Sequence, residues 1–435
     1  MYQDYKKILL SKITSKKINI GVIGLGYVGL PLAILFAKKG FSILGFDTDK
    51  NKIKTIVSNK SYINRIKPTD IISLNKKGKF FNNYKKISSC DVIIICVPTP
   101  LYKDKPDLSY IRKTVSSIKK YLRYGQIIIL ESTSYPGTTE EEIIKKIPAR
   151  YKIGKNLFIG FSSERINPGE NENKMYKIPK VISGFSKNCE QLINKFYSIF
   201  FKKLVKANTI KTAEFSKLLE NIYRAVNIGF INEMKFVADK MNMDIYEIIK
   251  IANTKPYGFV RFDPGPGVGG NCIPIDPNYL FWKAKKIGIS ANFIKLSAET
   301  NYKVVKFIKT KILKKLIDLN VKKNKAKILI MGLSYKKNVD DLREASSLKL
   351  IKLLKSKNIG TIDYSDPYVK KGVNTRDFKF NLKNVKPTSR NLSRYDIVII
   401  MTDHDVFNYK SIYKYSNHII DCRGRFKTDK RVSRG

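Results

Sequence analysis

Short runs of apolar residues punctuate the first part of the chain, and each is followed by a stretch with helical spacing. The run at 18–23 leads into a glycine-rich turn at 24–29, after which apolar residues at 30–39 recur with the period of a helix. Comparable runs predict strands at 41–46, 91–97, 126–130, 157–161 and 181–183. Strands that alternate with helical segments predict a parallel sheet covered by helices.

The middle of the chain has a helical pattern without a clear break. From about residue 209 to 241, apolar positions recur at helical spacing, namely at Phe215, Leu218, Leu219, Ile222, Val226 and Phe230. A helix of this length more often connects domains or forms a subunit interface than lies on a surface. The segment 263–277 is rich in Gly and Pro and predicts a loop, and further helix is expected to about residue 319.

A second α/β pattern begins near residue 327. Apolar runs predict strands at 328–331, 361–364 and 397–401, and helical spacing predicts a helix at 346–354. The 435 residues exceed one ordinary hydrophobic core. We therefore expect three domains, at residues 1–205, 206–320 and 321–435.

Composition narrows the class of protein. Hydrophobic residues make up 43% of the chain, which is enough for globular packing. The longest apolar runs fall far short of the ~18 residues that a membrane span needs, so no membrane insertion is expected. Residues 1–17 lack the apolar segment of a signal peptide, and a cytoplasmic protein is expected.

The formal net charge of +48 raises the alternative of a basic nucleic-acid-binding protein. Such a protein would bind any duplex with an affinity that falls steeply with salt. However, Lys and Arg occur singly or in pairs along the whole chain, with no block of five or six basic residues. We therefore interpret the charge as a lysine-rich surface and expect no nucleic-acid partner.

Cysteine and histidine usage argues against metal chemistry. The five cysteines are widely spaced and contain no CxxC pair, which is not the pattern of a disulfide framework or a structural zinc site. Only two histidines occur, His404 and His418, both near the C-terminus. A His-based triad or a His-ligated metal would need most of that supply, so no metal is expected.

A dinucleotide motif follows the first predicted strand. Gly24, Gly26 and Gly29 form GxGxxG at the start of a helix, where they permit a tight turn, a close approach of a pyrophosphate, and helix–strand packing. Asp47 ends the next predicted strand, where its carboxylate can accept hydrogen bonds from ribose hydroxyls and repel a 2′-phosphate. The motif therefore predicts NAD rather than NADP as the cofactor.

One cysteine lies in an unusual context. Cys272 occurs in the Gly- and Pro-rich segment, whose glycines allow close approach of a ligand, whereas Cys96 lies in an apolar strand and is expected to be core. A thiol near pH 7 needs a nearby cation or base to act as a nucleophile. Lys217 and Asn221 share a face of the long helix, and Arg224 extends it, although an ordinary solvated stripe has the same pattern.

Five motifs in order resemble one family along nearly the whole chain. These are the glycine motif, Glu131-Ser-Thr133-Ser-Tyr-Pro-Gly-Thr138, Lys217-Leu-Leu-Glu-Asn221, the Cys272 loop, and Asp340-Asp-Leu-Arg343-Glu. Together they are similar to the UDP-glucose/GDP-mannose dehydrogenase family. The resemblance implies an α/β fold of two Rossmann-like domains with parallel sheets joined by a central helical region.

The resemblance also implies a reaction and the residues that perform it. NAD takes a hydride from the primary alcohol of a nucleotide sugar, Cys272 adds to the aldehyde as a thiohemiacetal, and a second oxidation leaves a thioester that water hydrolyses to the uronate. The implied catalytic residues are Cys272, Lys217, Asn221, Asp276 and Glu164. The implied cofactor-binding residues are Gly24, Gly26, Tyr27, Val28, Gly29, Asp47, Thr99, Thr133 and Arg343. The implied substrate-binding residues are Arg165, Ile166, Arg224, Tyr335, Lys336 and Arg423.

Within the family, the segments 161–169 and 264–277 are most similar to the UDP-N-acetylglucosamine 6-dehydrogenase branch, which acts in polysaccharide biosynthesis. UDP-N-acetylgalactosamine, UDP-N-acetylmannosamine, UDP-glucose and GDP-mannose remain alternative substrates. Asn271, Asn278 and Ser163 depart from the branch, which has His, an aromatic residue and Pro at these positions. A folded NAD-binding protein that no longer turns over is a further alternative. The resemblance implies a homodimer or higher homo-oligomer through the long central helix.

Overall fold

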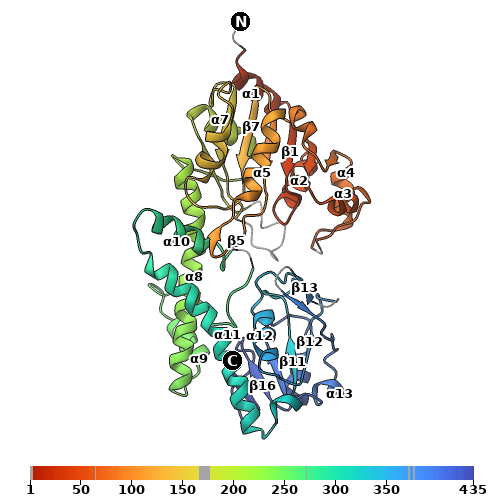
Figure 1. Cartoon of the computed structure of the whole chain (residues 1–435), viewed down its shortest axis with the longest axis vertical. Coiled ribbons are helices and arrows are strands. Elements are labelled where there is room, and N and C mark those ends of the chain that lie inside the picture. The colour runs from red at the N-terminus through yellow and green to blue at the C-terminus, as the bar shows by residue number, and fades with distance from the viewer. Residues whose placement is uncertain (1–2, 64, 166–176, 271, 371–372, 376–377) are drawn as a thin grey trace. The chain divides into compact units, whose positions relative to one another are not determined.

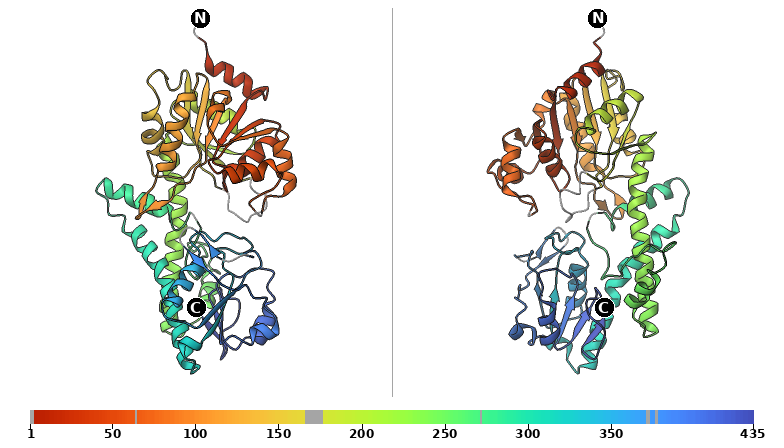
Figure 2. Two further views of the ribbon diagram at one scale, coloured as in Figure 1. Left: turned by 45° about the vertical axis from the view of Figure 1, so that its right-hand side comes forward. Right: turned by 180° about the vertical axis from the view of Figure 1, so that it is seen from behind.

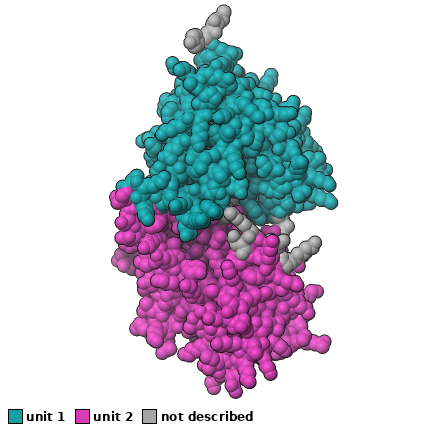
Figure 3. All heavy atoms as spheres, in the orientation of Figure 1, with its two compact units in different colours: residues 1–220, 282–287 teal, residues 221–281, 288–435 magenta. Residues whose placement is uncertain are grey.

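The computed structural model describes residues 3–63, 65–165, 177–270, 272–370, 373–375 and 378–435. The chain forms two compact units (Figure 3). Unit 1 comprises residues 1–220 and 282–287, and unit 2 comprises residues 221–281 and 288–435. The three-domain division expected above stays a prediction.

Unit 1 contains a sheet of eight strands in the order β10-β9-β8-β7-β4-β1-β2-β3. Neighbouring strands are parallel except β8 and β9, which are antiparallel, so the last two strands run against the other six. The antiparallel pair was not predicted from the apolar runs, which carry no direction. The bounds are β1 (Asn19–Ile23), β2 (Ser42–Phe46), β3 (Gly78–Phe81), β4 (Val92–Ile95), β7 (Gln126–Leu130), β8 (Leu157–Phe161), β9 (Lys180–Gly184) and β10 (Leu204–Lys206).

Helices cover this sheet, as Figures 1 and 2 show. They are α1 (Tyr5–Thr14), α2 (Gly29–Lys38), α3 (Lys50–Val57), α4 (Pro68–Asn75), α5 (Ser109–Ile118) and α7 (Lys187–Tyr197). Phe36 of α2 and Phe196 of α7 meet with ring centroids 5.6 Å apart and, with Leu9 and Ile13 of α1, form one core on the sheet. A short hairpin of β5 (Leu101–Tyr102) and β6 (Lys105–Pro106) follows β4.

The long helix predicted in the middle of the chain is α8 (Ile210–Lys240). It is followed by α9 (Ile245–Ala252), α10 (Asp276–Lys286) and α11 (Asn292–Asp318). The predicted loop at 263–277 runs two residues too far, because α10 already begins at Asp276. Pro277 is compatible with that start, since a first helical turn needs no N–H from the proline.

Unit 2 contains a parallel sheet of five strands in the order β12-β11-β15-β16-β17. The strands are β11 (Lys327–Met331), β12 (Thr361–Ser365), β15 (Ile397–Ile400), β16 (Ile419–Asp421) and β17 (Val432–Arg434). Helices α11 and α12 (Ser346–Lys355) pack on one face, and α13 (Ser389–Leu392) and α14 (Tyr409–Tyr415) on the other. A hairpin of β13 (Val373–Asn374) and β14 (Lys379–Phe380) completes the unit. The prediction of two Rossmann-like sheets with a helical region is confirmed.

The same turn ends the first strand of each sheet. Gly24 after β1 has φ +89° and Gly332 after β11 has φ +78°, and each N–H donates to the last residue of the neighbouring strand at 2.8 Å. In each unit the next N–H, of Leu25 or Leu333, donates to an aspartate that follows that neighbouring strand. The two α/β units therefore share a local design as well as a topology.

Candidate active site

The glycine turn of unit 1 has the geometry that a pyrophosphate needs. A Cβ atom on Gly29 would lie 1.9 Å from the carbonyl oxygen of Gly24, so only glycine lets α2 start this close to β1. A Cβ atom on Gly26 would meet no atom within 4 Å. The backbone at Gly26 is therefore open on the side where a side chain would stand, and a phosphate can approach its N–H.

Asp47 lies where the sequence placed it, directly after β2, and is only 8% exposed. Its Oδ2 accepts hydrogen bonds from Leu25 N (2.9 Å) and Lys52 Nζ (3.2 Å), and its Oδ1 accepts one from Asp49 N (3.0 Å). These contacts fix the carboxylate against the glycine turn. Because an ionised carboxyl has about four acceptor positions, it can still receive ribose hydroxyls. The residues of this turn thus fit a bound NAD.

Hydrogen bonds connect the loops that follow β4 and β7, at the carboxyl ends of these two neighbouring strands. Thr99 Oγ1 donates to the carbonyl of Thr133 (2.8 Å), and Ser132 Oγ donates to the carbonyl of Val97 (2.7 Å). Both threonines are half-buried. Ligands of open α/β sheets bind outside the carboxyl ends of the strands, so these loops lie where a cofactor site is expected.

Glu214 of α8 is a supporting residue that the sequence did not reveal. Its buried carboxylate accepts hydrogen bonds from Gly137 N (2.5 Å), Thr139 N (2.9 Å) and Thr139 Oγ1 (2.7 Å). It thereby anchors the loop that carries Thr133 to the long helix. Burial raises the pKa of Glu214 to about 7. An acidic residue among buried positions of α8 was the signal that could have identified it.

Two further candidates of unit 1 follow β8. Arg165 makes a bidentate ion pair with Glu220 of α8, with Nη2–Oε1 at 2.6 Å and Nε–Oε2 at 3.2 Å, and its Nη1 donates to the carbonyl of Pro179. The N–H of Arg165 donates to Glu164 Oε1 (2.7 Å). Lys217 of α8 is buried. Ile166 lies outside the described residues.

In unit 2 the Gly- and Pro-rich segment is hydrogen-bonded to other elements near both of its ends. Asn232 of α8 accepts from Gly265 N (3.0 Å), and Lys235 donates to the carbonyl of Gly265 (3.0 Å). Burial lowers the pKa of Lys235 to about 8. Farther along, Gly270 N donates to the carbonyl of Arg343 (2.8 Å). A loop of seven successive Gly, Pro and Val residues is thereby held in one conformation ahead of Cys272.

Cys272 is the exposed cysteine of this chain, whereas Cys96 packs against the core as predicted. The carbonyl of Cys272 accepts a hydrogen bond from the N–H of Asp276 (2.9 Å), so the turn between these two residues leads directly into α10. Asn221 of α8 donates from Nδ2 to Asp276 Oδ2 at 2.5 Å, and both side chains are buried. Unit 2 therefore brings Cys272, Asp276 and Asn221 into one constellation.

The candidates after β11 lie in a loop that a buried histidine supports. The side chain of Tyr335 lies against Gly269 and Gly270 of the cysteine segment, since a Cβ atom on Gly269 would lie 2.5 Å from the Tyr335 Cβ and one on Gly270 would lie 3.0 Å from the Tyr335 ring. His404 accepts from Asn338 N at Nδ1 (3.0 Å), and its Nε2 lies 3.1 Å from Asp366 Oδ2. Burial alone would raise the pKa of Asp366, but the contact with His404 holds it below the usual value.

The remaining arginines have different surroundings. Arg343 is in a bidentate contact with Asp341, with Nε–Oδ1 at 2.9 Å and Nη2–Oδ2 at 2.6 Å. Arg423 donates from Nε to the carbonyl of Met401 (2.8 Å) and lies beside Gly265. Arg224 is exposed on α8. Lys336 lies in the loop after β11, where the hydroxyl of Ser334 donates to the carbonyl of Lys336 (2.9 Å).

Two of the three departures from the branch, Ser163 and Asn278, lie among the described residues. Ser163 is buried, and its carbonyl accepts from Lys180 Nζ (3.3 Å). Asn278 caps the turn before α10 by donating to the carbonyl of Pro274 (2.8 Å). Asn271 lies outside the described residues.

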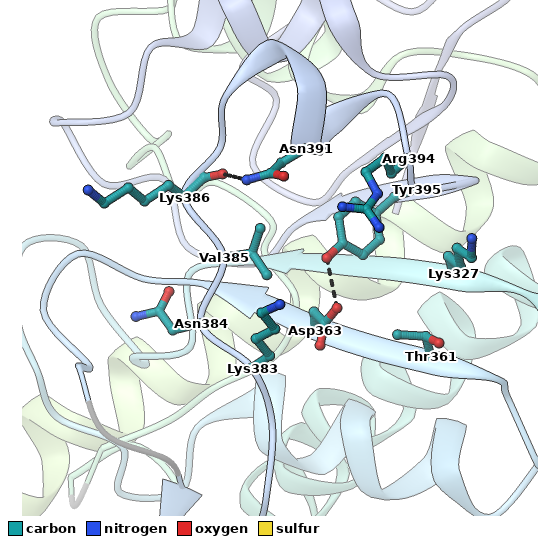
Figure 4. A pocket seen from close by; sticks show the side chains of 10 residues that line it. All are labelled: Lys327, Thr361, Asp363, Lys383, Asn384, Val385, Lys386, Asn391, Arg394 and Tyr395. Atoms are coloured by element: carbon teal, nitrogen blue, oxygen red, sulfur yellow. Dashed lines mark hydrogen bonds between the residues drawn. The ribbon is translucent and has the colours of Figure 1, made fainter.

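Unit 2 contains a pocket of about 390 Å³ that residues of its sheet line in part (Figure 4). Lys327 and Thr361, which begin β11 and β12, line it, so it opens at the amino ends of the strands. The Tyr395 hydroxyl donates to Asp363 across the pocket (2.7 Å). Ligands of such sheets bind at the opposite, carboxyl ends, where Tyr335 and Lys336 follow β11.

The described part of the chain contains neither a membrane-spanning helix nor a cluster of metal-binding side chains. No helix there is long and apolar enough to cross a membrane. No group of three or more His, Cys, Asp and Glu side chains there could hold a metal ion.

The glycine turn with Asp47 places the protein among the dinucleotide-dependent enzymes built on Rossmann folds. Comparison with known families narrows this class. The UDP-glucose/GDP-mannose dehydrogenase family matches with its NAD binding domain at residues 18–201, its central domain at 211–303 and its UDP binding domain at 329–428. The chain belongs to this family, and it is an NAD-dependent nucleotide-sugar dehydrogenase, an oxidoreductase.

Similar proteins cover nearly the full length. The chain is 33% identical to the UDP-N-acetyl-D-glucosamine 6-dehydrogenase of Pseudomonas aeruginosa, over 95% of this chain and 99% of that protein. It is 35% identical to the UDP-N-acetyl-D-mannosamine dehydrogenase of Methanocaldococcus jannaschii, over 91% and 87%. The solved structure of the UDP-D-ManNAc dehydrogenase of Pyrococcus horikoshii aligns with a TM-score of 0.84 at 31% identity, over 95% and 97%.

Proposed function

We propose that this enzyme oxidises the primary alcohol of UDP-N-acetylglucosamine to the carboxylate of UDP-N-acetylglucosaminuronate, with Cys272 as the covalent nucleophile. The observation that carries the proposal is the exposed Cys272 beside the buried Asn221–Asp276 pair. Core cysteines of this chain, such as Cys90 and Cys422, have pKa values that burial raises to about 12. Cys272, in contrast to these two, is exposed, and it follows a loop whose Gly265 and Gly270 N–H groups are hydrogen-bonded.

The residues divide the chemical work. Two NAD molecules, bound in succession at the glycine turn, would each accept one hydride. Asn221 and Lys217 stabilise the oxyanion at the reacting carbon, and Lys217 assists the removal of the hydroxyl proton. Cys272 adds to the aldehyde and holds it as a thiohemiacetal, so the reactive aldehyde stays bound. Asp276 fixes Asn221, and Glu164 accepts a proton from the water that hydrolyses the thioester.

The cofactor residues of the proposal are those of the glycine turn and its neighbours. Gly24, Gly26, Tyr27, Val28 and Gly29 would hold the pyrophosphate, and Asp47 the adenosine ribose. Thr99 and Thr133 would line the nicotinamide end, and Arg343 would add a cation. Cations suit the nucleotide sugar too, because its pyrophosphate is anionic. Its proposed ligands are Arg165, Ile166, Arg224, Tyr335, Lys336 and Arg423.

UDP-N-acetylmannosamine is the second candidate substrate. Relatives of nearly equal identity are named for the N-acetylglucosamine and for the N-acetylmannosamine sugar. The two sugars share the N-acetyl group and differ in configuration at one carbon. An N-acetylated UDP-hexosamine is therefore the common proposal, and a direct assay decides between the two.

The test is NADH stoichiometry with the purified protein. The enzyme is mixed with excess NAD and a limiting amount of each UDP-sugar, and absorbance is followed to completion. Two NADH per UDP-N-acetylglucosamine, with none from a Cys272→Ala variant, support the proposal. Two NADH from UDP-N-acetylmannosamine alone support the second candidate. NAD binding without NADH from any nucleotide sugar refutes catalysis.

We further propose a homodimer through α8. Exposed apolar side chains on this helix lie within a stripe roughly 80° wide at 3.6 residues per turn. Tyr223 and Phe230, near the middle, are 50% and 58% exposed. The other members of the stripe are Phe215, Leu219 and Val237. A contiguous apolar stripe on a long helix is typical of a subunit interface.

A further inference from the structure

A buried cluster of ionisable side chains lies in unit 1, at the carboxyl ends of strands β7 and β8. Glu131 directly follows β7, and Glu164 lies shortly after β8. Because β9 runs antiparallel to β8, its first residue, Lys180, returns to these carboxyl ends. The antiparallel strand therefore supplies a cation at the point where two acidic residues leave parallel strands.

The ammonium group of Lys180 is buried and lies close to two carboxylates. The side chain is 2% exposed, and its Nζ lies 2.7 Å from Glu131 Oε2 and 3.7 Å from Glu164 Oε2. The rings of Tyr197 and Phe201 flank it, each with the centroid 5.3 Å from Nζ. The Tyr197 hydroxyl donates to the other carboxylate oxygen of Glu131. Glu131 and Tyr197, which are both buried, thus fix the position of Lys180, whereas the side chain of Glu164 is 12% exposed.

Two carboxylates share this one cation. Burial raises the pKa of Glu131 to about 7, although the nearby ammonium of Lys180 opposes that rise. Burial alone would lower the pKa of Lys180, but Glu131 and Glu164 raise it above its ordinary value. The ammonium therefore stays charged. A buried ion pair contributes little net stability compared with apolar residues of the same size, so folding alone does not call for it.

We propose that Lys180 is a positioning residue that fixes the Glu164 carboxylate for hydrolysis of the Cys272 thioester. This inference rests on the proposed function. In the hydrolysis, the water oxygen bonds to the acyl carbon and the carbon–sulfur bond breaks. One water proton passes to Glu164 and then to the departing sulfur, which restores the thiol and leaves the uronic acid. Glu131 and Tyr197 act one step farther back, by holding Lys180.

The experiment measures the covalent intermediate as well as turnover. Wild type and variants are mixed with NAD and UDP-sugar, quenched at steady state, and the fraction of Cys272 that carries the acyl group is read from the intact protein mass. The variant E131Q/K180M removes the cation together with its buried partner, so no lone buried charge remains behind Glu164. We expect its hydrolysis rate to fall on the order of tenfold, since a full general base contributes ~10²–10⁴. The acyl-enzyme should accumulate accordingly.

Controls separate positioning from folding. Tyr197→Phe removes the hydrogen bond to Glu131 but leaves Lys180 facing Glu164, so hydrolysis should change less than in E131Q/K180M. Glu164→Gln should accumulate acyl-enzyme, and adding E131Q/K180M to it should cause no further loss. Thermal unfolding and NAD binding check that each variant is folded.

The outcomes are distinct. Wild-type levels of acyl-enzyme and turnover in folded E131Q/K180M, or losses that multiply in the triple variant, overturn the inference. Wild-type enzyme that forms neither adduct nor NADH overturns the proposed function and this inference with it. If E131Q/K180M does not fold, Glu131→Gln carries the test. It leaves Lys180 to Glu164, so the acid limb of hydrolysis should move to lower pH, and an unmoved limb overturns the inference.

Discussion

Gly29 and Gly26 belong to one motif but should fail in different ways when each is changed to alanine. A Cβ atom on Gly29 would lie 1.9 Å from the carbonyl oxygen of Gly24, whereas one on Gly26 would touch nothing within 4 Å. The first substitution therefore acts on the fold of unit 1. The second acts only on what binds the turn, because the methyl group occupies the space that a pyrophosphate needs.

The magnitudes follow from these contacts. In Gly29→Ala, the start of α2 must move by roughly 1 Å or more, and forced overpacking of this kind costs about 1–3 kcal/mol or more. For a unit of this size, that lowers Tm by roughly 2–4 °C per kcal/mol. In Gly26→Ala, stability should stay level or rise by ~0.4–1 kcal/mol, because alanine restricts the unfolded chain. NAD affinity should fall by about tenfold or more, which is ~1.4 kcal/mol.

The chain offers a specific probe for the assay. Trp282, its one tryptophan, belongs to unit 1 and lies against Tyr135 with ring centroids 5.0 Å apart. Its fluorescence during thermal unfolding reports on the unit that holds the glycine turn, and calorimetric titration reports NAD affinity. A Gly29→Ala variant with wild-type Tm, or a Gly26→Ala variant that binds NAD normally, would falsify the reasoning.

Three further predictions concern buried charge and assembly. Because burial raises the pKa of Glu214 to about 7, the folded state keeps a proton that the unfolded state loses above the ordinary glutamate pKa of 4.5. The free energy of unfolding of the wild type, relative to that of Glu214→Gln, should therefore fall by up to about 3 kcal/mol as the pH rises from 4.5 to about 7, and it should stay low above pH 7. Urea unfolding of the two proteins with equal pH dependence contradicts this prediction. Asn221→Asp places two buried carboxyls within hydrogen-bond distance of each other, so one must stay protonated, and thermal stability should drop at pH 8 but recover toward pH 5. A Tm loss that does not depend on pH would show that the two groups do not interact. For the proposed homodimer through α8, Phe230→Glu should give a monomer in light scattering, since the apolar side chain of Phe230 is 58% exposed. Lys250→Glu, an exposed charge change on α9, is the control, and a dimer that persists in both variants contradicts the α8 interface.

The apolar pattern was sufficient to locate most of the sheet strands, because a buried parallel strand is a continuous apolar run. It was not sufficient for strand direction. The run at 181–183 reads like its neighbours, but β9 lies antiparallel to β8, and that reversal is what brings Lys180 to Glu131. Short edge elements such as β3 and β17 were also not predicted, since their exposed positions interrupt the apolar run.

The sequence by itself determined the glycine turn, the acidic residue after the second strand, and the exceptional context of Cys272. In these cases the chemistry depends on residues that are close along the chain, so spacing carries the information. The tertiary structure alone decided the contacts of Asn221 with Asp276, of Glu214 with Thr139, and of His404 with Asp366. Each joins residues that are far apart in sequence and neutralises or satisfies a buried polar group. Which partner meets that need depends on how strands and helices pack, and no local pattern of residue types encodes it.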